Sequence, residues 1–244
     1  VKTVDIGLGD IQASYYNIEA QEMVFLAYHG AGKRVALDGT VLGDVEAPVE
    51  VSNLLDGATY DQVNKTALLV DQACNFAEVD PVTLAPISIT KLDAKFGLSV
   101  CSGLAVGLDG HLWLTSTNTD EVVAITRDLT TEVARYKVDG FGLTNVDGIS
   151  LIAGSENFLV LSTFDLKAAI LTPGGGLIVP ASTIGGAMPP LVGGDTPAIP
   201  DAVLTVCGNG HAWICEGLVQ NKVGCYEYAP EGGGGDSCPC VIPG

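Results

Sequence analysis

The sequence has few basic residues, few charges of any kind and no long hydrophobic run. Lysine and arginine total 11 against 29 aspartate and glutamate residues, which gives a formal net charge of −18. A charge of this sign is repelled by phosphate backbones and by anionic lipid surfaces. The chain also lacks the run of about 18 apolar residues that crosses a bilayer. We therefore expect no nucleic-acid partner and no membrane insertion.

The motifs of several common enzyme classes are also missing. The chain contains no Gly-x-Ser-x-Gly elbow, no phosphate-binding loop that ends in Gly-Lys-Ser/Thr and no His-Glu-x-x-His. These absences argue against the usual serine hydrolase, nucleotide-binding and zinc protease chemistries. No segment carries the apolar spacing of an amphipathic helix of three turns, so a helical or α/β fold has little support.

The seven cysteines favour an oxidising compartment, and we expect a secreted or otherwise extracytoplasmic protein. Cys215 and Cys225 fall on adjacent predicted strands, opposite each other, where a cross-strand disulfide would fit. The pairing of the remaining cysteines is open, because connectivity does not follow from sequence. Cys238 or Cys240 of the tail is expected to pair with Cys74, Cys101 or Cys207.

A cassette of short apolar strands and tight turns recurs about every 46 residues. In its clearest copy, an Asp109-Gly110 hairpin turn precedes the strand His111–Thr115, and two further strands follow. Four such strands in sequence make one blade of a propeller. The second strands of the copies align at 24–28, 67–71, 112–116, 158–162 and 212–216.

The two ends of the chain indicate how the ring closes. The last copy stops after its third strand, 223–228, and a spare strand at 2–8 precedes the first copy. We therefore predict an all-β fold: a five-bladed β-propeller of four antiparallel strands per blade, spanning residues 1–230 and closed by the N-terminal strand. A Gly/Cys-rich tail follows at 231–244. There are two alternatives: a six-bladed propeller, whose sixth blade would lie between 174 and 200, and an open β-sandwich.

The residues that open the innermost strands repeat around the central channel. Neighbouring carboxylates in a channel repel, so some are protonated or they share a cation. Oxygen ligands favour Ca²⁺, which we take as the candidate cofactor. In the alternative interpretation the aspartates only cap turns. The candidate ligands are Asp10, Asp56, Asp147, Asp201 and Asn145, and Ser102 opens the third copy.

Two segments resemble the calcium-dependent gluconolactonase and strictosidine-synthase-like propellers. They are Ser102-Gly103-Leu104 and Asn145-Val146-Asp147-Gly148, which match that family's Asn-Gly or Asp-Gly opening of the inner strand. The resemblance implies a small-molecule enzyme, commonly a lactonase or ester hydrolase. The family usually has six blades and a glutamate ligand near its N-terminus, whereas this chain has five copies and Asp10 in that place.

We expect a monomeric enzyme that binds a small organic molecule at the channel mouth, where Asp201 and His29 are the candidate catalytic residues. The leading hypothesis is a metal-assisted lactonase or ester hydrolase. The alternatives are a non-hydrolytic cyclase or isomerase of an apolar metabolite, or a lectin-like binding propeller. The ends of the second strands supply the candidate substrate contacts: Tyr28, Asp71, Ser116 or Thr117, Ser162 or Thr163, and Glu216.

Overall fold

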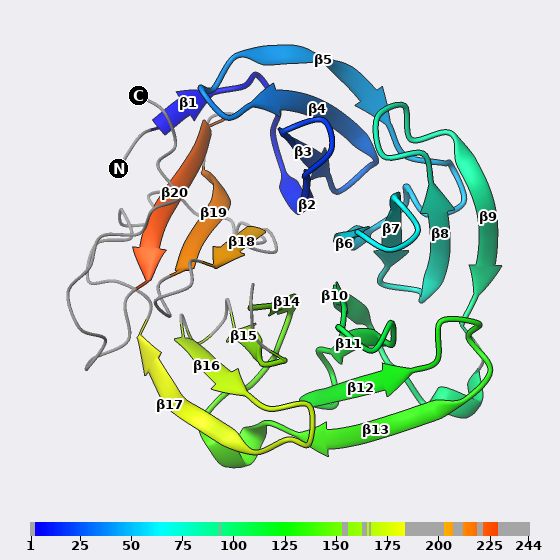
Figure 1. Ribbon diagram of the computed structural model, residues 1–244, viewed down its shortest axis with the longest axis vertical. Helices are drawn as coiled ribbons and strands as arrows, with labels where there is room; N and C mark the ends of the chain where they lie inside the picture. The colour runs from blue at the N-terminus through cyan, green and yellow to red at the C-terminus, as the bar shows by residue number, and fades with distance from the viewer. Residues whose placement is uncertain are drawn as a thin grey trace.

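The computed structural model describes residues 3–92, 94–152, 156–162, 165, 167–183, 203–206, 212–218 and 222–228, with the backbone alone at 3–4, 179–183 and from 203 onward. Within these residues the strands form five four-stranded sheets. The sheets surround a central axis, with β2, β6, β10, β14 and β18 innermost (Figure 1). The predicted all-β propeller is confirmed.

Each of the first four sheets takes its strands in sequence order from the axis to the rim, and all neighbouring strands are antiparallel. The first sheet contains β2 (Ile11–Asn17), β3 (Glu22–Ala27), β4 (Ala31–Ala36) and β5 (Val41–Glu46). The second contains β6 (Leu55–Asp61), β7 (Thr66–Asp71), β8 (Asn75–Val79) and β9 (Pro86–Lys91). The third contains β10 (Cys101–Val106), β11 (Leu112–Ser116), β12 (Glu121–Ile125) and β13 (Glu132–Lys137), and the fourth contains β14 (Gly148–Leu151), β15 (Phe158–Ser162), β16 (Lys167–Leu171) and β17 (Leu177–Thr183).

The fifth sheet joins the two ends of the chain, as predicted. Its order is β18 (Val203–Val206), β19 (Ala212–Leu218), β20 (Lys222–Tyr228) and β1 (Thr3–Asp5), and Thr3 pairs with Gly224. Because β1 supplies the rim strand of the last blade, the ring is fastened by backbone hydrogen bonds. Cys215 and Cys225 lie directly opposite each other in this sheet, as expected. The predicted tail at 231–244 and residues 184–202 lie outside the described residues.

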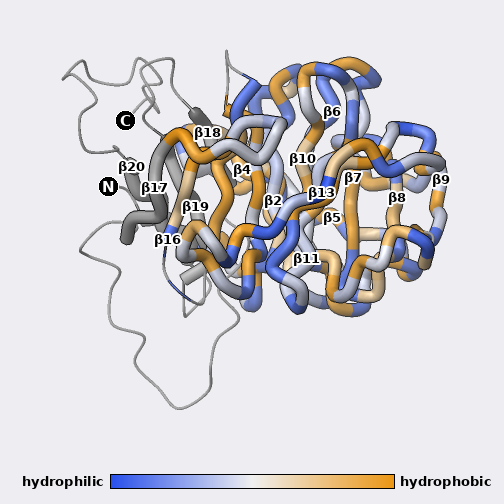
Figure 2. Tube along the Cα trace, turned by 90° about the horizontal axis from the view of Figure 1, so that it is seen from below, coloured by the Kyte–Doolittle hydropathy of each residue, from blue (hydrophilic) through white to orange (hydrophobic). Residues whose placement is uncertain are grey.

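Burial follows the position of a strand within its blade. The second strand β7 is buried along almost its whole length, whereas the rim strand β9 is exposed throughout. Figure 2 shows hydrophobic residues along β7 and β10. The helices among the described residues are two single 3₁₀ turns, at Ala94–Phe96 and Asp139–Phe141. No helix in this part of the chain is long and apolar enough to span a membrane.

The apolar core lies between neighbouring sheets rather than along the axis. One cluster joins the first and second sheets through Leu26 and Leu69, and the next joins the second and third through Phe76 and Leu114. Between the third and fourth sheets, Trp113 packs against Phe158 with ring centroids 4.6 Å apart. The second and third sheets are therefore apolar on both faces, which explains the continuous hydrophobic runs of their second strands.

Two further links hold the second and third sheets together. A disulfide joins Cys74, in the turn after β7, to Cys101 at the start of β10. This finding corrects the prediction that Cys74 or Cys101 pairs with the C-terminal tail. Away from the disulfide, Arg127 donates from Nε to Asp61 (3.1 Å) and from Nη2 to Glu78 (2.6 Å).

Gly57 allows β6 and β10 to approach each other closely at the axis. A Cβ atom at this position would overlap the Ser102 carbonyl oxygen of the next sheet and lie 2.8 Å from Val70 Cγ1. The carbonyl belongs to the backbone of a buried strand, so it cannot move aside as a side chain would. The residue type at position 57 thus sets the distance between two inner strands.

We predict that Gly57→Ala lowers the free energy of unfolding by about 2–3 kcal/mol, because overpacking forces the inner strands apart. Gly43→Ala on the rim strand β5 is the matched control, since no atom lies within 4 Å of the added Cβ. Urea denaturation of both variants checks the difference. Equal stability of the two variants would contradict the close approach of β6 and β10.

Candidate functional site

A residue with left-handed backbone precedes each of the first four inner strands. The strand begins one residue after the first three and three residues after the fourth. The first three also accept a hydrogen bond at their carbonyl from the N–H of the residue directly after the second strand of the same sheet. Leu and Val rarely adopt this conformation, so the two occurrences here are strained. Such strain tends to collect at functional sites. The residues are Asp10 (φ 50°), Leu54 (φ 67°), Val100 (φ 60°) and Asn145 (φ 48°).

This repeat corrects the predicted alignment of the first copy. Asp10 and Asn145 occupy the left-handed position, so Asp10 corresponds to Leu54 and not to Asp56. Two places after each left-handed residue comes a residue that also repeats from sheet to sheet. In β2, β6 and β10 this residue lies in a β-bulge, where the pairing with the second strand is irregular. We call this set the axial ring: Gln12, Asp56, Ser102 and Asp147.

The axial ring therefore contains the Gln12 amide where the sequence alignment placed the Asp10 carboxylate, while Asp56, Ser102 and Asp147 are the residues that the alignment predicted. Asp10 lies outside it and is exposed. Gln12, Asp56 and Ser102 are all buried, and Asp147 is partly buried. The fifth candidate, Asp201, lies outside the described residues.

Asp56 is a buried acid surrounded by uncharged hydrogen-bonding groups. Its side chain is 7% exposed. Gln72 Nε2 donates to Asp56 Oδ2 at 2.9 Å, and the Ser102 side chain also hydrogen-bonds to this carboxyl group. Burial raises the pKa of Asp56 to about 7, against the opposing effect of the hydrogen bonds. Both protonation states are therefore populated near neutral pH.

One aromatic residue beside the first sheet, Tyr28, lies near this acid, and a second, His29, contacts Tyr28. Tyr28 directly follows β3 and is partly buried; burial and the nearby Asp56 carboxyl both raise the pKa of its hydroxyl, so Tyr28 remains a hydrogen-bond donor at neutral pH. His29 is exposed and meets the Tyr28 ring edge-on, with ring centroids 5.2 Å apart. The structure thus places two of the predicted residues, Tyr28 and His29, at the same end of the molecule as Asp56.

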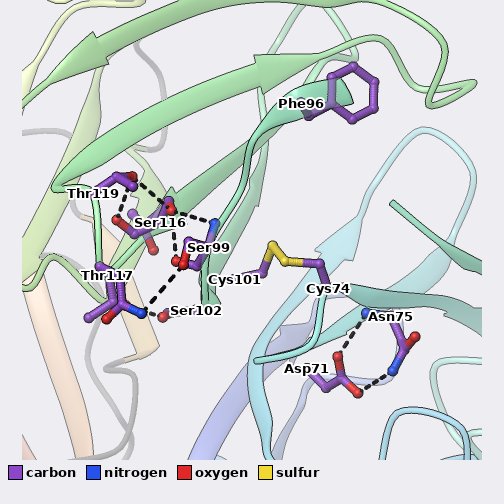
Figure 3. The surroundings of a disulfide bond; sticks show 12 residues. Asp71, Cys74, Asn75, Phe96, Ser99, Cys101, Ser102, Ser116, Thr117 and Thr119 are labelled. Atoms are coloured by element: carbon purple, nitrogen blue, oxygen red, sulfur yellow. Dashed lines mark hydrogen bonds between the residues drawn. A yellow bond between two sulfur atoms is a disulfide. The ribbon is translucent and has the colours of Figure 1, made fainter. Parts of the chain in front are cut away.

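The predicted contacts at the ends of the other second strands point into the loops instead. Asp71 accepts hydrogen bonds from the backbone and side-chain nitrogens of Asn75, at 2.7 and 2.6 Å. Ser116 is buried and donates to the Ser99 carbonyl at 2.9 Å, and the buried Ser162 donates to the Thr144 carbonyl. Figure 3 shows Asp71 turned to Asn75 and Ser116 turned to Ser99. Glu216 lies in β19, where only the backbone is described.

Asp71 and Ser116 each have a neighbour, one residue later, that lies at the ring. The backbone N–H groups of Tyr28, Gln72 and Thr117 bond to the left-handed residues of their own sheets, so the three positions are equivalent. Of the pair Ser116 or Thr117, Thr117 is therefore the residue at the ring. Gln72 was missed because no pattern in the sequence separates it from Asp71, and Gln12 was missed because the first copy was aligned two residues too early.

The Ca²⁺ ion expected from the sequence remains a prediction, because the candidate ligand Asp201 lies outside the described residues. No group of three or more His, Cys, Asp or Glu side chains in the described ranges converges as metal ligands. Asp56 Oδ2 accepts a hydrogen bond from the neutral Gln72 side chain. A Ca²⁺ site would instead surround the ion with several oxygen ligands.

A groove of about 430 Å³ lies elsewhere, between the second and third sheets, where Asp61 and Arg127 meet. Its charged groups are engaged with one another: Arg127 bonds to Asp61, and His111 Nδ1 lies 2.6 Å from Asp109 Oδ2. Because these pairs already satisfy their charges, the groove offers less for a reactive ligand than the axial ring.

No protein-family model and no curated protein matches this chain. Solved structures do resemble it. A glutaminyl cyclase from Myxococcus xanthus is 11% identical, with 94% of this chain and 96% of that chain covered and a TM-score of 0.68. A streptogramin B lyase is 13% identical, with 94% and 87% covered and a TM-score of 0.57. A virginiamycin B lyase from Staphylococcus aureus, determined with quinupristin, is 14% identical, with 88% and 69% covered and a TM-score of 0.53.

These identities show a common fold and nothing finer. The propeller neighbours include two lyases and a cyclase, so the fold carries enzymes of these kinds. The resemblance to the gluconolactonase and strictosidine-synthase-like family remains a prediction.

We predict that Val100→Asn raises the free energy of unfolding by about 0.5–1 kcal/mol, because Asn tolerates the left-handed backbone that a β-branched residue resists. Asn145 already occupies the equivalent position in the fourth sheet. Val133→Asn on the rim strand β13, where Val133 is 46% exposed, is the control for loss of the valine side chain. If chemical denaturation shows the two variants equally destabilised, the strain at position 100 is disproved.

The raised pKa of Asp56 also predicts how stability depends on pH. Its folded-state pKa of about 7 lies above the ordinary value of 3.8, so its favourable contribution is complete below about pH 4 and is lost as the pH rises to 7. Asp56→Asn should therefore stabilise the protein at pH 8 by up to about 4 kcal/mol and have little effect at pH 4. Thermal melting of both proteins across this range measures the difference. A pH-independent effect of the substitution would refute a buried, titrating Asp56.

Proposed function

We propose that this protein is an enzyme that moves protons within a small, neutral or cationic organic molecule at the axial ring, as a cyclase, isomerase or lyase does. The carrying observation is Asp56, a buried carboxyl group with a pKa of about 7 and neutral partners. A group whose pKa lies near the working pH can both donate and accept a proton within one catalytic cycle. Asp56 would be the general acid and base.

The surrounding residues suit this role. Gln72 fixes the carboxyl group through Oδ2, and the Tyr28 hydroxyl is a donor that could bond an oxygen or nitrogen of the substrate. The acids at this end and the net charge of −18 disfavour anionic substrates. Among the similar solved structures are two lyases and a cyclase. This likeness supports the hypothesis of a non-hydrolytic enzyme over that of a metal-assisted lactonase.

The compartment is part of the proposal. The Cys74–Cys101 disulfide lies beside the ring and would form in an oxidising environment, which supports an extracytoplasmic location. The protein is expected to act as a monomer.

The test is a screen of lactones, esters, amides and amino-acid derivatives, followed by mass spectrometry. In hydrolysis the masses of all products sum to the substrate plus one water. In elimination or cyclisation they sum to the substrate alone, and isomerisation leaves the mass of the molecule unchanged. We predict a product of the second or third kind, with a pH dependence of kcat/KM centred near the pKa of Asp56. Asp56→Asn should lower kcat about 10²–10⁴-fold.

Asp44→Asn on the rim strand β5 is the matched control and should retain full activity, since its carboxylate is exposed and pairs only with Lys33 there. Hydrolysis of lactones or esters that survives Asp56→Asn would contradict the proposal and favour the lactonase hypothesis. Loss of activity in both variants would show that the effect is not specific to the ring.

A further inference from the structure

Three exposed apolar side chains lie at the end of the propeller opposite the axial ring. The inner strands β2, β6 and β10 begin at the ring, and these side chains occupy the turns that follow the three strands (Figure 1). The exposed fractions are 46% for Ile18, 78% for Val63 and 67% for Leu108. Polar residues, glycine and proline ordinarily dominate tight turns, so an apolar residue at this place in three sheets is a repeated feature of the surface.

Contacts between the turns join these side chains into one surface. Glu19 of the first turn pairs with Lys65 of the second, at 3.2 Å between Oε1 and Nζ. Val63 of the second turn lines the groove of about 430 Å³ together with Asp109 of the third. The three turns are therefore neighbours, and exposed apolar residues that gather in this way mark interaction sites. We call this set the apolar turns: Ile18, Val63 and Leu108.

The groove between the second and third of these turns is negatively charged. Three carboxylates and two basic side chains line it, so the sum is negative even with the histidine protonated: Asp61, Asp109, Asp128, Arg127 and His111. In the described part of the chain, the groups that bond to Asp128 are uncharged: two threonine hydroxyls of its own turn, at 2.6 and 2.8 Å, and one backbone N–H. These hydrogen bonds hold the pKa of Asp128 below its usual range, so this carboxylate is ionised at neutral pH.

Apolar side chains beside a negatively charged groove select one kind of partner. A second copy of this chain would bring the same carboxylates face to face, and the net charge of −18 on each copy opposes that contact. An anionic lipid surface is repelled for the same reason. A polypeptide segment that carries both apolar and basic side chains matches the surface, because it covers the apolar turns and brings a cation to the groove.

We propose that the apolar turns and the groove form a docking surface for a segment of another protein that carries apolar residues together with lysine or arginine. The apolar side chains of the segment pack on Val63 and Leu108, and one of its basic side chains enters the groove beside Asp128. The surface lies at the opposite end of the propeller from the axial ring, so a bound partner leaves the ring open to a small molecule. The proposal thus goes beyond the proposed function and does not depend on it.

The test uses the full chain and a short synthetic peptide of alternating leucine and lysine. Two matched peptides are the controls: serine replaces leucine in one, and glutamate replaces lysine in the other. Backbone amide shifts, followed by NMR as peptide is added, locate the bound peptide and give its Kd. We expect the largest shifts at the apolar turns and at Asp128, and binding of each control peptide that is weaker by about 10-fold or more.

Variants separate the apolar and the charged parts of the surface. Val63→Ser combined with Leu108→Ser should weaken binding of the leucine-lysine peptide by about 10-fold or more, because the apolar packing is lost. Asp128→Asn should weaken it by about 3–5-fold and make the Kd less sensitive to salt. All three positions are exposed, so these variants are expected to fold, which thermal melting checks.

Matched changes on the rim of the propeller are the controls. Leu42→Ser combined with Ile89→Ser, on β5 and β9, replaces two other exposed apolar residues, and Asp44→Asn on β5 replaces another exposed carboxylate. Both control proteins should bind the leucine-lysine peptide as the wild-type protein does.

Several results would overturn the proposal. One is the absence of binding, and another is binding that survives the double substitution at Val63 and Leu108. Equal binding of the serine-lysine peptide would mean that charge alone attracts the peptide. A dimer in light scattering, or adsorption to phosphatidylcholine vesicles, that the double substitution abolishes would assign the surface to a second copy or to lipid. None of these measurements uses a substrate, so they succeed or fail independently of the activity screen.

Discussion

The close packing of the inner strands around the axis is the constraint on which the rest of the structure depends. Gly57 lets β6 reach the Ser102 carbonyl, and this approach brings the bulged residues of neighbouring sheets together. The same crowding excludes water from Asp56, which is 7% exposed. The architecture of the ring and the chemistry of its acid therefore have one cause, the short distance between adjacent inner strands.

A buried carboxyl group keeps a pKa near neutral only where no positively charged side chain pairs with it. The structure supplies the Gln72 amide and the Ser102 hydroxyl rather than a lysine or arginine. Burial raises the pKa of Asp56 to about 7, because these two uncharged partners lower it by less than burial raises it. The Cys74–Cys101 disulfide fastens the residue next to Ser102, and this link would help keep the ring in register while the acid changes charge.

Much of the fold could be predicted from the repeat, because the period of the strands and the spare strand at 2–8 are visible in the sequence. The site was harder. Asp10 and Asp56 both precede or open an inner strand, and only the left-handed backbone at Asp10 and Leu54 shows that they are not equivalent. The sequence also did not separate Asp71 from Gln72, since which side chain turns to the axis depends on the loop that follows. The environment of Asp56 depends on contacts across three sheets, which no local pattern encodes.

The measurement that tests this account most directly is the titration of the Asp56 carboxyl group in the wild-type protein, followed by its ¹³C shift. The account predicts a midpoint of about 7, because the carboxyl group is buried among uncharged partners. A midpoint near the ordinary value of 3.8 would mean that the carboxyl group is solvated or paired with a cation, and would contradict the account of the axial ring.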